Sequence, residues 1–120
     1  MKRVRIGDVV LRPMVPHVIA SFTDRTPERV LRAAVKNGLS LLEARVDLFE
    51  NVEPAHVVGV LERARAVAPV LATVRFRAEG GAWSRTERER LALYRAIAPH
   101  ADALDVELDA RIRADVARIA

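Results

Sequence analysis

Residues 41–47 of this chain read LLEARVD, and this stretch is the strongest indication of the fold. It begins as an apolar run typical of a buried strand and becomes charged at its C-terminal end. A charge inside a core is costly unless it is paired or used, and ligands collect at the C-terminal ends of strands in α/β proteins. Alternation along a strand would also place Glu43, Arg45 and Asp47 on one face. The stretch therefore predicts a strand that ends in a site.

A second stretch, residues 72–81 (ATVRFRAEGG), repeats this pattern. Alternation places Thr73, Arg75 and Arg77 on one face, and we expect Arg77, the outermost, to be solvated. An arginine followed by an acid and two glycines can bring backbone and charge close to a ligand. The rigid guanidinium fork of Arg75 suits an anionic or hydroxyl-rich small molecule. No Gly-Lys-Ser/Thr follows, which excludes a Walker phosphate loop.

Both stretches also have an ordinary structural interpretation. The charges of residues 41–47 could form a salt bridge at a strand end that begins a surface loop. The Gly-Gly pair at 80–81 is, by itself, most often only a loop signal.

Two further acids, Asp105 and Glu107, lie two residues apart on a later predicted strand, so alternation places them on one face. Together with Glu43 they could supply the counter-charges for Arg45 and Arg75, since buried charges need partners. We expect Asp105 and Glu107 to support a site rather than to act in catalysis.

Predicted strands and helices alternate along the rest of the chain. Residues 2–12 alternate around Gly7-Asp8 and predict a β-hairpin. Strands are expected at 17–21, where the strand is short and buried, and at 39–45, 70–75 and 103–108.

Proline and capping signals mark the helices between these strands. Thr26-Pro27 predicts an N-cap and first helical residue, and Asn37-Gly38 predicts the end of that helix. Pro54 opens the second helix, residues 84–87 (SRTE) have capping-box spacing for the third, and Pro99 closes it. The apolar residues expected to face the core, helix by helix, are Val30, Leu31, Ala34 and Val35; Val57, Val58, Leu61 and Ala64; Leu91, Tyr94 and Ile97; and Ile112, Val116 and Ile119.

A hairpin followed by four βα units predicts a parallel α/β sheet with right-handed crossovers. No low-complexity linker divides residues 1–120, so we expect one domain. Four units with charges at their strand ends look like half of an eight-unit (β/α)8 barrel, which typically needs ~250 residues. The last helix runs to the final residue without a cap, and we expect the chain to be part of a longer one.

Composition narrows the classes of protein. The chain is 51% apolar and 30% charged, which indicates a globular protein rather than a disordered one. It has no cysteine, which removes disulfides, thiolate nucleophiles and cysteine-bound metals and fits the cytoplasm. Its apolar stretches are interrupted well before ~20 residues, so no membrane span is predicted. No apolar signal core follows the basic N-terminus.

The net charge of +4 comes almost wholly from arginine, because Lys2 and Lys36 are the only lysines. The arginines are interleaved with acids, which favours solvated helix faces over a nucleic-acid surface. His17, His56 and His100 have no metal-ligand spacing and join no hydrolase motif, and we expect no metal site. His56 and His100 are expected to face solvent.

With these residues laid out, the chain resembles type I 3-dehydroquinate dehydratase, the (β/α)8 enzyme of the shikimate pathway. The matching pieces, in order, are an N-terminal hairpin that caps the bottom of the barrel, a strand ending in Ser21, Glu43-x-Arg45-x-Asp47, Arg75 followed by 78–81 (AEGG), and a strand containing Asp105-x-Glu107-Leu108. The resemblance covers this chain but only about the first half of the family's length.

The resemblance implies dehydration of 3-dehydroquinate to 3-dehydroshikimate without a cofactor. In the family a lysine forms a Schiff base with the substrate ketone, which acidifies the neighbouring proton, and a histidine moves the protons. By resemblance, Ser21, Glu43, Arg45 and Arg75 would contact the substrate, and Glu79 would orient the histidine. Asp47, Asp105 and Glu107 would support these residues.

The chain departs from the family in the covalent machinery. The family's histidine follows the next strand in a Ser/Asn-His-Asp setting, and its lysine lies on a later strand. Lys2 and Lys36 lie where neither is expected to reach a substrate. We therefore expect no activity from this chain alone. We also expect the open sheet to be closed by a partner, either a second copy of the chain or a C-terminal half. The alternative is a non-catalytic half-barrel that dimerises or binds a small polyhydroxy carboxylate.

Overall fold

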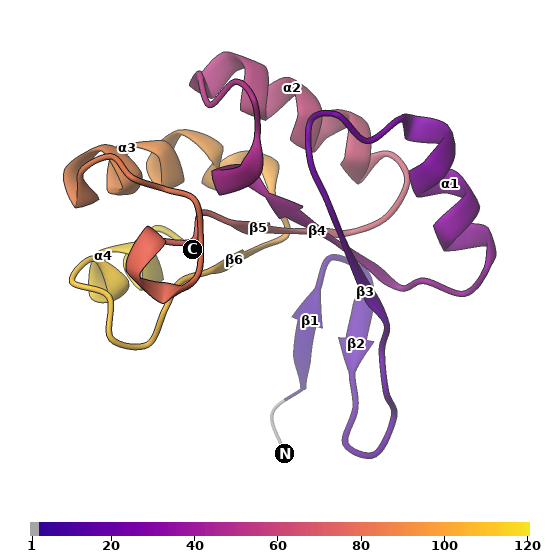
Figure 1. The fold of residues 1–120 in the computed structure, drawn as a ribbon. Helices are drawn as coiled ribbons and strands as arrows, with labels where there is room; N and C mark the ends of the chain where they lie inside the picture. Colours follow the sequence, from indigo (N-terminus) through magenta and orange to yellow (C-terminus); the bar gives the residue numbers. More distant parts are fainter. Residues whose placement is uncertain (1–2) are drawn as a thin grey trace.

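A four-stranded parallel sheet organises the chain, and the computed structural model describes it over residues 3–120. The strands follow the order β3-β4-β5-β6, and helices α1, α2 and α3 lie along one side of the sheet (Figure 1). The strands are β3 (Ile19–Phe22), β4 (Leu41–Arg45), β5 (Val70–Thr73) and β6 (Ala103–Asp105). The helices are α1 (Glu28–Lys36), α2 (Pro54–Arg65), α3 (Glu87–Ile97) and α4 (Arg113–Ile119). The predicted α/β class with four βα units is confirmed.

The strand register brings polar residues together near the C-terminal ends of the strands. Ser21 pairs with Glu43 across β3 and β4, Arg45 pairs with Thr73 across β4 and β5, and Thr73 pairs with Asp105 across β5 and β6. Because paired residues in neighbouring strands point to the same face, these five side chains share one face, called here the polar face. The other face of the sheet meets the helices.

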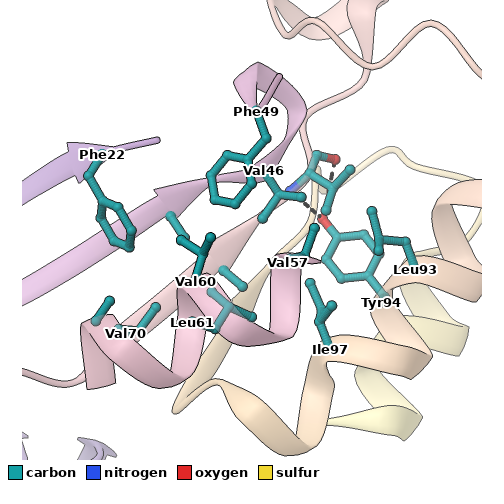
Figure 2. Packing of buried hydrophobic residues seen from close by; sticks show 14 of the residues in the cluster. Phe22, Val46, Phe49, Val57, Val60, Leu61, Val70, Leu93, Tyr94 and Ile97 are labelled. Carbon is teal, nitrogen blue, oxygen red and sulfur yellow. Dashed lines mark hydrogen bonds between the residues drawn. The ribbon is translucent and has the colours of Figure 1, made fainter. Parts of the chain in front are cut away.

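The core lies between that second face and the helices (Figure 2). Leu42 and Ala44 of β4 and Val70 of β5 are completely buried, as are Val57 and Leu61 of α2. Each large aliphatic side chain buried in this way stabilises the fold by about 1.5–3 kcal/mol. This packing fixes the strands that carry the polar face.

The hairpin of β1 (Val4–Ile6) and β2 (Val9–Leu11) forms as predicted, around Gly7-Asp8. Gly7 has φ +60°, and a Cβ there would come within 2.9 Å of the Pro69 ring. Pro69 directly precedes β5, so the hairpin packs at the N-terminal ends of the strands, away from the polar ends. The start of the predicted range, Lys2, lies outside the described residues.

The strands are shorter than the sequence predicts. The two strands expected to run to 75 and to 108 end at Thr73 and Asp105. The 3₁₀ turn η1 (Val46–Leu48) follows β4 directly, and η2 (Arg77–Glu79) comes a short distance after β5. The first strand of the sheet is not buried as predicted, because β3 is an edge strand in which only Phe22 is buried.

Two predicted helix starts are also wrong. Thr26 does not cap α1, since its hydroxyl accepts the backbone N–H of Thr23 and the helix follows Pro27. The capping box of α3 pairs Thr86 with Glu89 and lies two residues after the predicted one.

The helix faces follow the predicted pattern with a few exceptions. Val30 is exposed, and Val60, which was not predicted to face the core, is buried. Within the described residues, no helix is long and apolar enough to cross a membrane.

Candidate functional site

Arg45 and Asp47 form a forked ion pair at the end of β4. Arg45 Nε and Nη2 donate to the two carboxylate oxygens of Asp47 over 3.0 and 2.8 Å. The Asp47 side chain is 0% exposed and that of Arg45 is 20% exposed, so the carboxylate is the buried anchor and the guanidinium reaches the surface. Asp47 also accepts the backbone N–H of Ala82 over 3.1 Å. Because Asp47 lies in turn η1, the turn, and not strand alternation, brings it to Arg45.

These contacts keep both groups charged. Burial by itself would raise the pKa of Asp47, but the hydrogen bonds from Arg45 and the Ala82 N–H outweigh it and hold that pKa below its ordinary value of 3.8. The hydrogen bond to Asp47 raises the pKa of Arg45, and the charges of Glu43 and Asp105 add to this effect. Arg45 therefore stays a cation at the strand end, with Asp47 as its paired anion.

Glu43 bridges the strands on either side of β4. It accepts the Ser21 hydroxyl over 2.6 Å and the Thr73 hydroxyl over 2.8 Å. The charge of Glu43 acts on Arg45 as a counter-charge, as predicted, while its two oxygens accept the hydroxyls from the neighbouring strands. The structure thus joins Ser21, Glu43 and Thr73 in one chain of hydrogen bonds across the polar face.

Arg75 lies beyond the end of β5 and pairs with Asp105 of β6, Nη2 to Oδ2, over 3.2 Å. Both side chains are about one-third exposed. This contact confirms Asp105 as a counter-charge for Arg75. Arg45 at the end of β4 and Arg75 just beyond the end of β5 are therefore each held by their own carboxylate.

The Gly80-Gly81 pair shapes the loop around Arg75. Gly80 has φ +81°, a conformation that glycine adopts without strain. A Cβ at Gly81 would come within 2.1 Å of the Arg75 carbonyl oxygen, and the Trp83 N–H donates to that oxygen over 3.1 Å. The glycines allow a close approach, as the sequence predicts, but the approach is to the backbone of Arg75.

Turn η2 carries Arg77 and Glu79, and both are exposed. Arg77 is solvated as predicted. Glu79 lines a cavity of about 390 Å³ together with Phe76, Arg90 and Glu107. Its predicted role of orienting a histidine stays a prediction.

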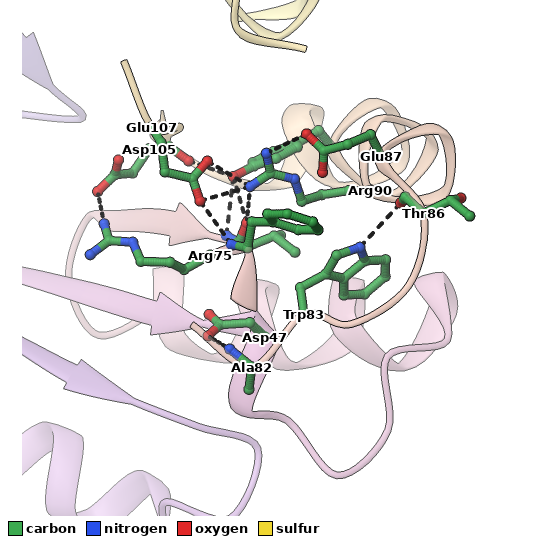
Figure 3. A network of polar contacts seen from close by, with 12 residues as sticks. Asp47, Arg75, Ala82, Trp83, Thr86, Glu87, Arg90, Asp105 and Glu107 are labelled. Carbon is green, nitrogen blue, oxygen red and sulfur yellow. Dashed lines mark hydrogen bonds and ion pairs between the residues drawn. The ribbon is translucent and has the colours of Figure 1, made fainter. Parts of the chain in front are cut away.

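Glu107 forms its ion pair with Arg90, so the prediction that it supplies a counter-charge for Arg45 or Arg75 is wrong. Because β6 ends at Asp105, alternation no longer places Glu107 on the polar face. Glu107 instead accepts Arg90 Nη1 over 2.7 Å and the Phe76 N–H over 2.7 Å (Figure 3).

Arg90 of α3 is the supporting residue that the sequence analysis missed. It is completely buried, and so is Tyr94 one turn later. The signal was present: Arg90, Leu93, Tyr94 and Ile97 have the i, i+3, i+4, i+7 spacing of one helix face. A charged residue on an apolar face needs a buried partner, and Glu107 is that partner.

Two histidines lie against carboxylates: His56 beside Asp24, and His100, whose Nδ1 is 2.8 Å from Glu62 and whose side chain is 36% exposed. His56, expected to face solvent, is only 35% exposed in its side chain, and its Nε2 lies 3.0 Å from Asp24. Asp24 also accepts the backbone N–H groups of Glu50 and Asn51, which ties the loop after β3 to the loop after β4. His17 is partly buried. Among residues 3–120, no group of three or more His, Asp or Glu could hold a metal ion.

The arrangement suits the recognition of a small anionic ligand. Two guanidinium groups lie at the ends of adjacent strands, and the Ser21–Glu43–Thr73 chain on the polar face offers hydroxyl and carboxylate oxygens. Guanidinium groups bind carboxylates through charge-assisted hydrogen bonds, and a carboxylate accepts hydroxyl protons. A polyhydroxy carboxylate carries both kinds of group.

Comparisons with known proteins agree on one family. A sequence model of that family, described as type I 3-dehydroquinase, matches residues 18–120. The 3-dehydroquinate dehydratase of Methanopyrus kandleri is 33% identical over 95 residues, a match that covers 77% of this chain and 44% of that protein. This chain thus spans less than half the length of that relative.

Solved structures give the same result. A type I 3-dehydroquinate dehydratase from Clostridium difficile superposes with a TM-score of 0.79 at 25% identity, covering 89% of this chain and 46% of that one. The 3-dehydroquinate dehydratase from Aquifex aeolicus superposes with a TM-score of 0.75 at 25% identity, covering 87% of this chain and 47% of that one. The four βα units correspond to half of an eight-unit barrel, which confirms the predicted half-barrel.

Proposed function

The chain belongs to the type I 3-dehydroquinase family, and from this premise we propose that it forms the substrate-holding side of a 3-dehydroquinate dehydratase site. The observation that carries the proposal is the pair of guanidinium groups at adjacent strand ends, Arg45 fixed by Asp47 and Arg75 fixed by Asp105. Cations held in this way need little reorganisation when a carboxylate ligand binds.

Four residues on or beside the polar face contact the ligand in this proposal. Arg45 and Arg75 bind the carboxylate and the adjacent oxygens of 3-dehydroquinate through charge-assisted hydrogen bonds. Ser21 and Glu43 bind ring hydroxyls, with the Glu43 carboxylate accepting and the Ser21 hydroxyl donating or accepting. Binding of this kind orients the ring so that its ketone and the hydroxyl to be lost face the reacting groups.

The covalent step, we propose, uses residues from outside this chain. A lysine amine attacks the ketone carbon, water leaves, and the imine makes the neighbouring C–H acidic enough for a histidine to remove its proton. The electrons of that bond then expel the ring hydroxyl, which leaves as water after protonation. Lys36 is a poor candidate, since it ends α1, and in a parallel βα unit that end lies near the start of the next strand. Lys2 lies outside the described residues.

Assembly is the second part of the proposal. Edge strands β3 and β6 each pair with one neighbour among the described strands, and unpaired strand edges attract further strands. Val18 and Ile19, at the start of β3, are 62% and 45% exposed. A second half-barrel, either another copy or a C-terminal half, would cover this edge and close the sheet.

The alternative function is non-catalytic binding of a polyhydroxy carboxylate. It is favoured by the same observation, because the residues of the polar face can hold a ligand without any covalent group. The two functions differ only in whether a Schiff base forms on a partner polypeptide.

Borohydride trapping tests the proposal. The chain would be incubated with 3-dehydroquinate and sodium borohydride, first alone and then together with the C-terminal half of a 3-dehydroquinate dehydratase relative. The mass of each polypeptide would then be measured by mass spectrometry. We expect no adduct on this chain, and an adduct on the partner half that requires this chain and is lost in its Arg75→Gln variant. An adduct on this chain would overturn the assignment of the lysine to a partner. No adduct in the mixture, with both halves bound to each other, would favour the non-catalytic alternative.

A further inference from the structure

We propose that Arg90 and Glu107 are positioning residues for Arg75: from the outer side of the sheet, they hold the backbone on both sides of this arginine. The proposal rests on the proposed function only in that Arg75 contacts the ligand. The contacts themselves lie outside the polar face.

The backbone around Arg75 needs partners because the β ladder has ended. The last paired residues of β5 and β6 are Thr73 and Asp105, so pairing between these strands does not satisfy the polar groups of residues 74–76. An isolated bridge between Phe76 and Trp83 satisfies the Arg75 carbonyl. Arg90 Nη1 donates to the Val74 carbonyl over 2.8 Å. On the other side of Arg75, the Phe76 N–H donates to Glu107 Oε1 over 2.7 Å.

Arg90 and Glu107 are joined to each other, which makes the two contacts one unit. Arg90 Nη1 lies 2.9 and 2.7 Å from the two Glu107 oxygens, and Nη2 donates to Glu87 over 2.8 Å. The guanidinium also lies 5.4 Å from the centroid of the Phe76 ring. Figure 3 shows Arg90 and Glu107 meeting beside the chain that carries Arg75.

The electrostatics of this unit suit a fixed position. Burial would lower the pKa of Arg90, but its hydrogen bonds to Glu87 and Glu107 reverse this effect and raise it. Burial likewise would raise the pKa of Glu107, but the Phe76 N–H and Arg90 hold it below its ordinary value. Both groups stay charged, and charged hydrogen bonds are short and directional.

Stability alone is a weak reason for such a pair. A buried ion pair adds little stability relative to well-packed apolar residues of similar volume. Its charge-assisted hydrogen bonds are short and directional, so they set the position of the groups that they hold. Here it binds the two residues that flank Arg75. The side chain of Arg75 extends to Asp105 and the polar face, so a shift of its backbone moves the guanidinium that we assign to the ligand.

The test uses the full chain and compares three variants. Arg90→Met with Glu107→Leu replaces the pair by apolar side chains, and Glu107→Gln is the milder variant in case the double variant does not fold. Glu87→Gln is the matched control, because it weakens one contact of Arg90 but touches neither Val74 nor Phe76.

The readout is amide hydrogen exchange at Trp83, whose N–H donates to the Arg75 carbonyl and contacts neither substituted side chain. The Leu42 amide, which donates to the Pro69 carbonyl, reports general stability. We expect the amide exchange rate of Trp83 to rise about tenfold in the double variant or in Glu107→Gln, while the exchange rate of the Leu42 amide stays unchanged. In the Glu87→Gln variant, both amides should exchange at the rates of the parent chain. We also expect the Kd for 3-dehydroquinate to rise about tenfold in the same variants.

Unchanged protection at Trp83 in a folded variant, or an equal rise at Trp83 and Leu42, would overturn the positioning role. If the parent chain does not bind 3-dehydroquinate, the proposed function fails, but the exchange measurement still decides whether Arg90 and Glu107 hold Arg75. Exchange that rises at Trp83 while the Kd stays constant would show that the held backbone does not govern ligand binding, and would also overturn the proposal.

Discussion

Gly81 lies against the backbone of Arg75 so closely that a Cβ at position 81 would meet the Arg75 carbonyl oxygen at 2.1 Å and its carbonyl carbon at 2.4 Å. Contacts this short cannot be relieved by rotating a side chain, because the atoms belong to the backbone. The glycine therefore sets where Arg75 can lie, together with the Trp83 N–H that binds the same oxygen.

Gly81→Ala should displace Arg75. We expect it to lower the free energy of unfolding by about 1–3 kcal/mol, since a methyl group forced into a packed site must push its neighbours apart. Urea denaturation measures the stability loss, and calorimetric titration with 3-dehydroquinate measures the accompanying loss of affinity.

Gly80→Ala is the matched control. Gly80 has φ +81° but nothing within 4 Å of an added Cβ. Alanine there should lower the free energy of unfolding by only the conformational term of about 1–2 kcal/mol. Affinity that falls equally in the two folded variants would contradict a specific role for the contact between Gly81 and Arg75.

Asp47→Asn should destabilise the chain and remove part of its sensitivity to acid. Asp47 is the buried anchor of Arg45, and removing one partner of such a pair costs about 3 kcal/mol. Because the folded-state pKa of Asp47 lies below its ordinary 3.8, its contribution is fully present above that value and is lost as the pH falls through the lower folded value. As the pH is lowered from 7 to 2, the urea midpoint of the Asp47→Asn variant should therefore fall less steeply than that of the parent chain.

Asp115→Asn provides the comparison, since Asp115 belongs to an exposed pair with Arg118. Exposed pairs contribute little, so this variant should follow the parent at every pH. If Asp47→Asn also follows the parent, the anchoring role of Asp47 is wrong.

Tyr94→Phe should loosen the end of β5, because Tyr94 of α3, like Arg90 one turn earlier, binds Val74 there. The Tyr94 hydroxyl accepts the Val74 N–H over 3.1 Å and donates to the Asp105 carbonyl over 2.5 Å. Its loss leaves buried backbone groups without a partner, which costs about 1–3 kcal/mol in the free energy of unfolding.

The same hydroxyl gives a spectroscopic signal, because Tyr94 is the only tyrosine. Burial raises its pKa to about 12. The stability tied to the neutral phenol is complete below the ordinary pKa of 10.0 and is lost as the pH rises toward the folded value. An absorbance titration of the folded chain that gave a pKa near 10 would contradict this burial.

Arg75→Gln and Arg45→Gln should each weaken binding of 3-dehydroquinate by about tenfold or more, since each removes a charged hydrogen-bond donor. Arg77→Gln, two residues from Arg75 but exposed on turn η2, should bind like the parent. Calorimetric titration distinguishes the three variants. Equal losses for Arg77→Gln and Arg75→Gln would indicate a diffuse effect of positive charge.

The sequence predicts the order of the elements and the strand-end charges well, because these depend on local signals. Pro54 and Gly38 mark helix ends by their backbone chemistry, and the charges of residues 41–47 interrupt an apolar run. The strand ends could not be placed, since a 3₁₀ turn such as η1 keeps a similar charge pattern while it changes where side chains point. Glu107, which follows the end of β6, therefore reaches different partners from those that alternation implies.

Other errors come from signals that occur twice or that conflict. Ser84 and Thr86 are each followed three residues later by a glutamate, so both have capping-box spacing, and only the fold selects Thr86. Arg90 was overlooked because a search for apolar periodicity discards a charged residue on the buried face. Its partner Glu107 lies 17 residues away, a pairing that periodicity alone does not reveal.

The most direct test of the central claim is an NMR titration of the ¹⁵N-labelled chain with 3-dehydroquinate, followed at the Nε–H groups of Arg45 and Arg75. We expect saturable shifts at both groups and at the amide of Glu43, absent in Arg75→Gln and retained in Arg77→Gln. Shifts confined to other parts of the chain, or none at either arginine at saturating ligand, would contradict the assignment of the polar face as the substrate-holding side of the site.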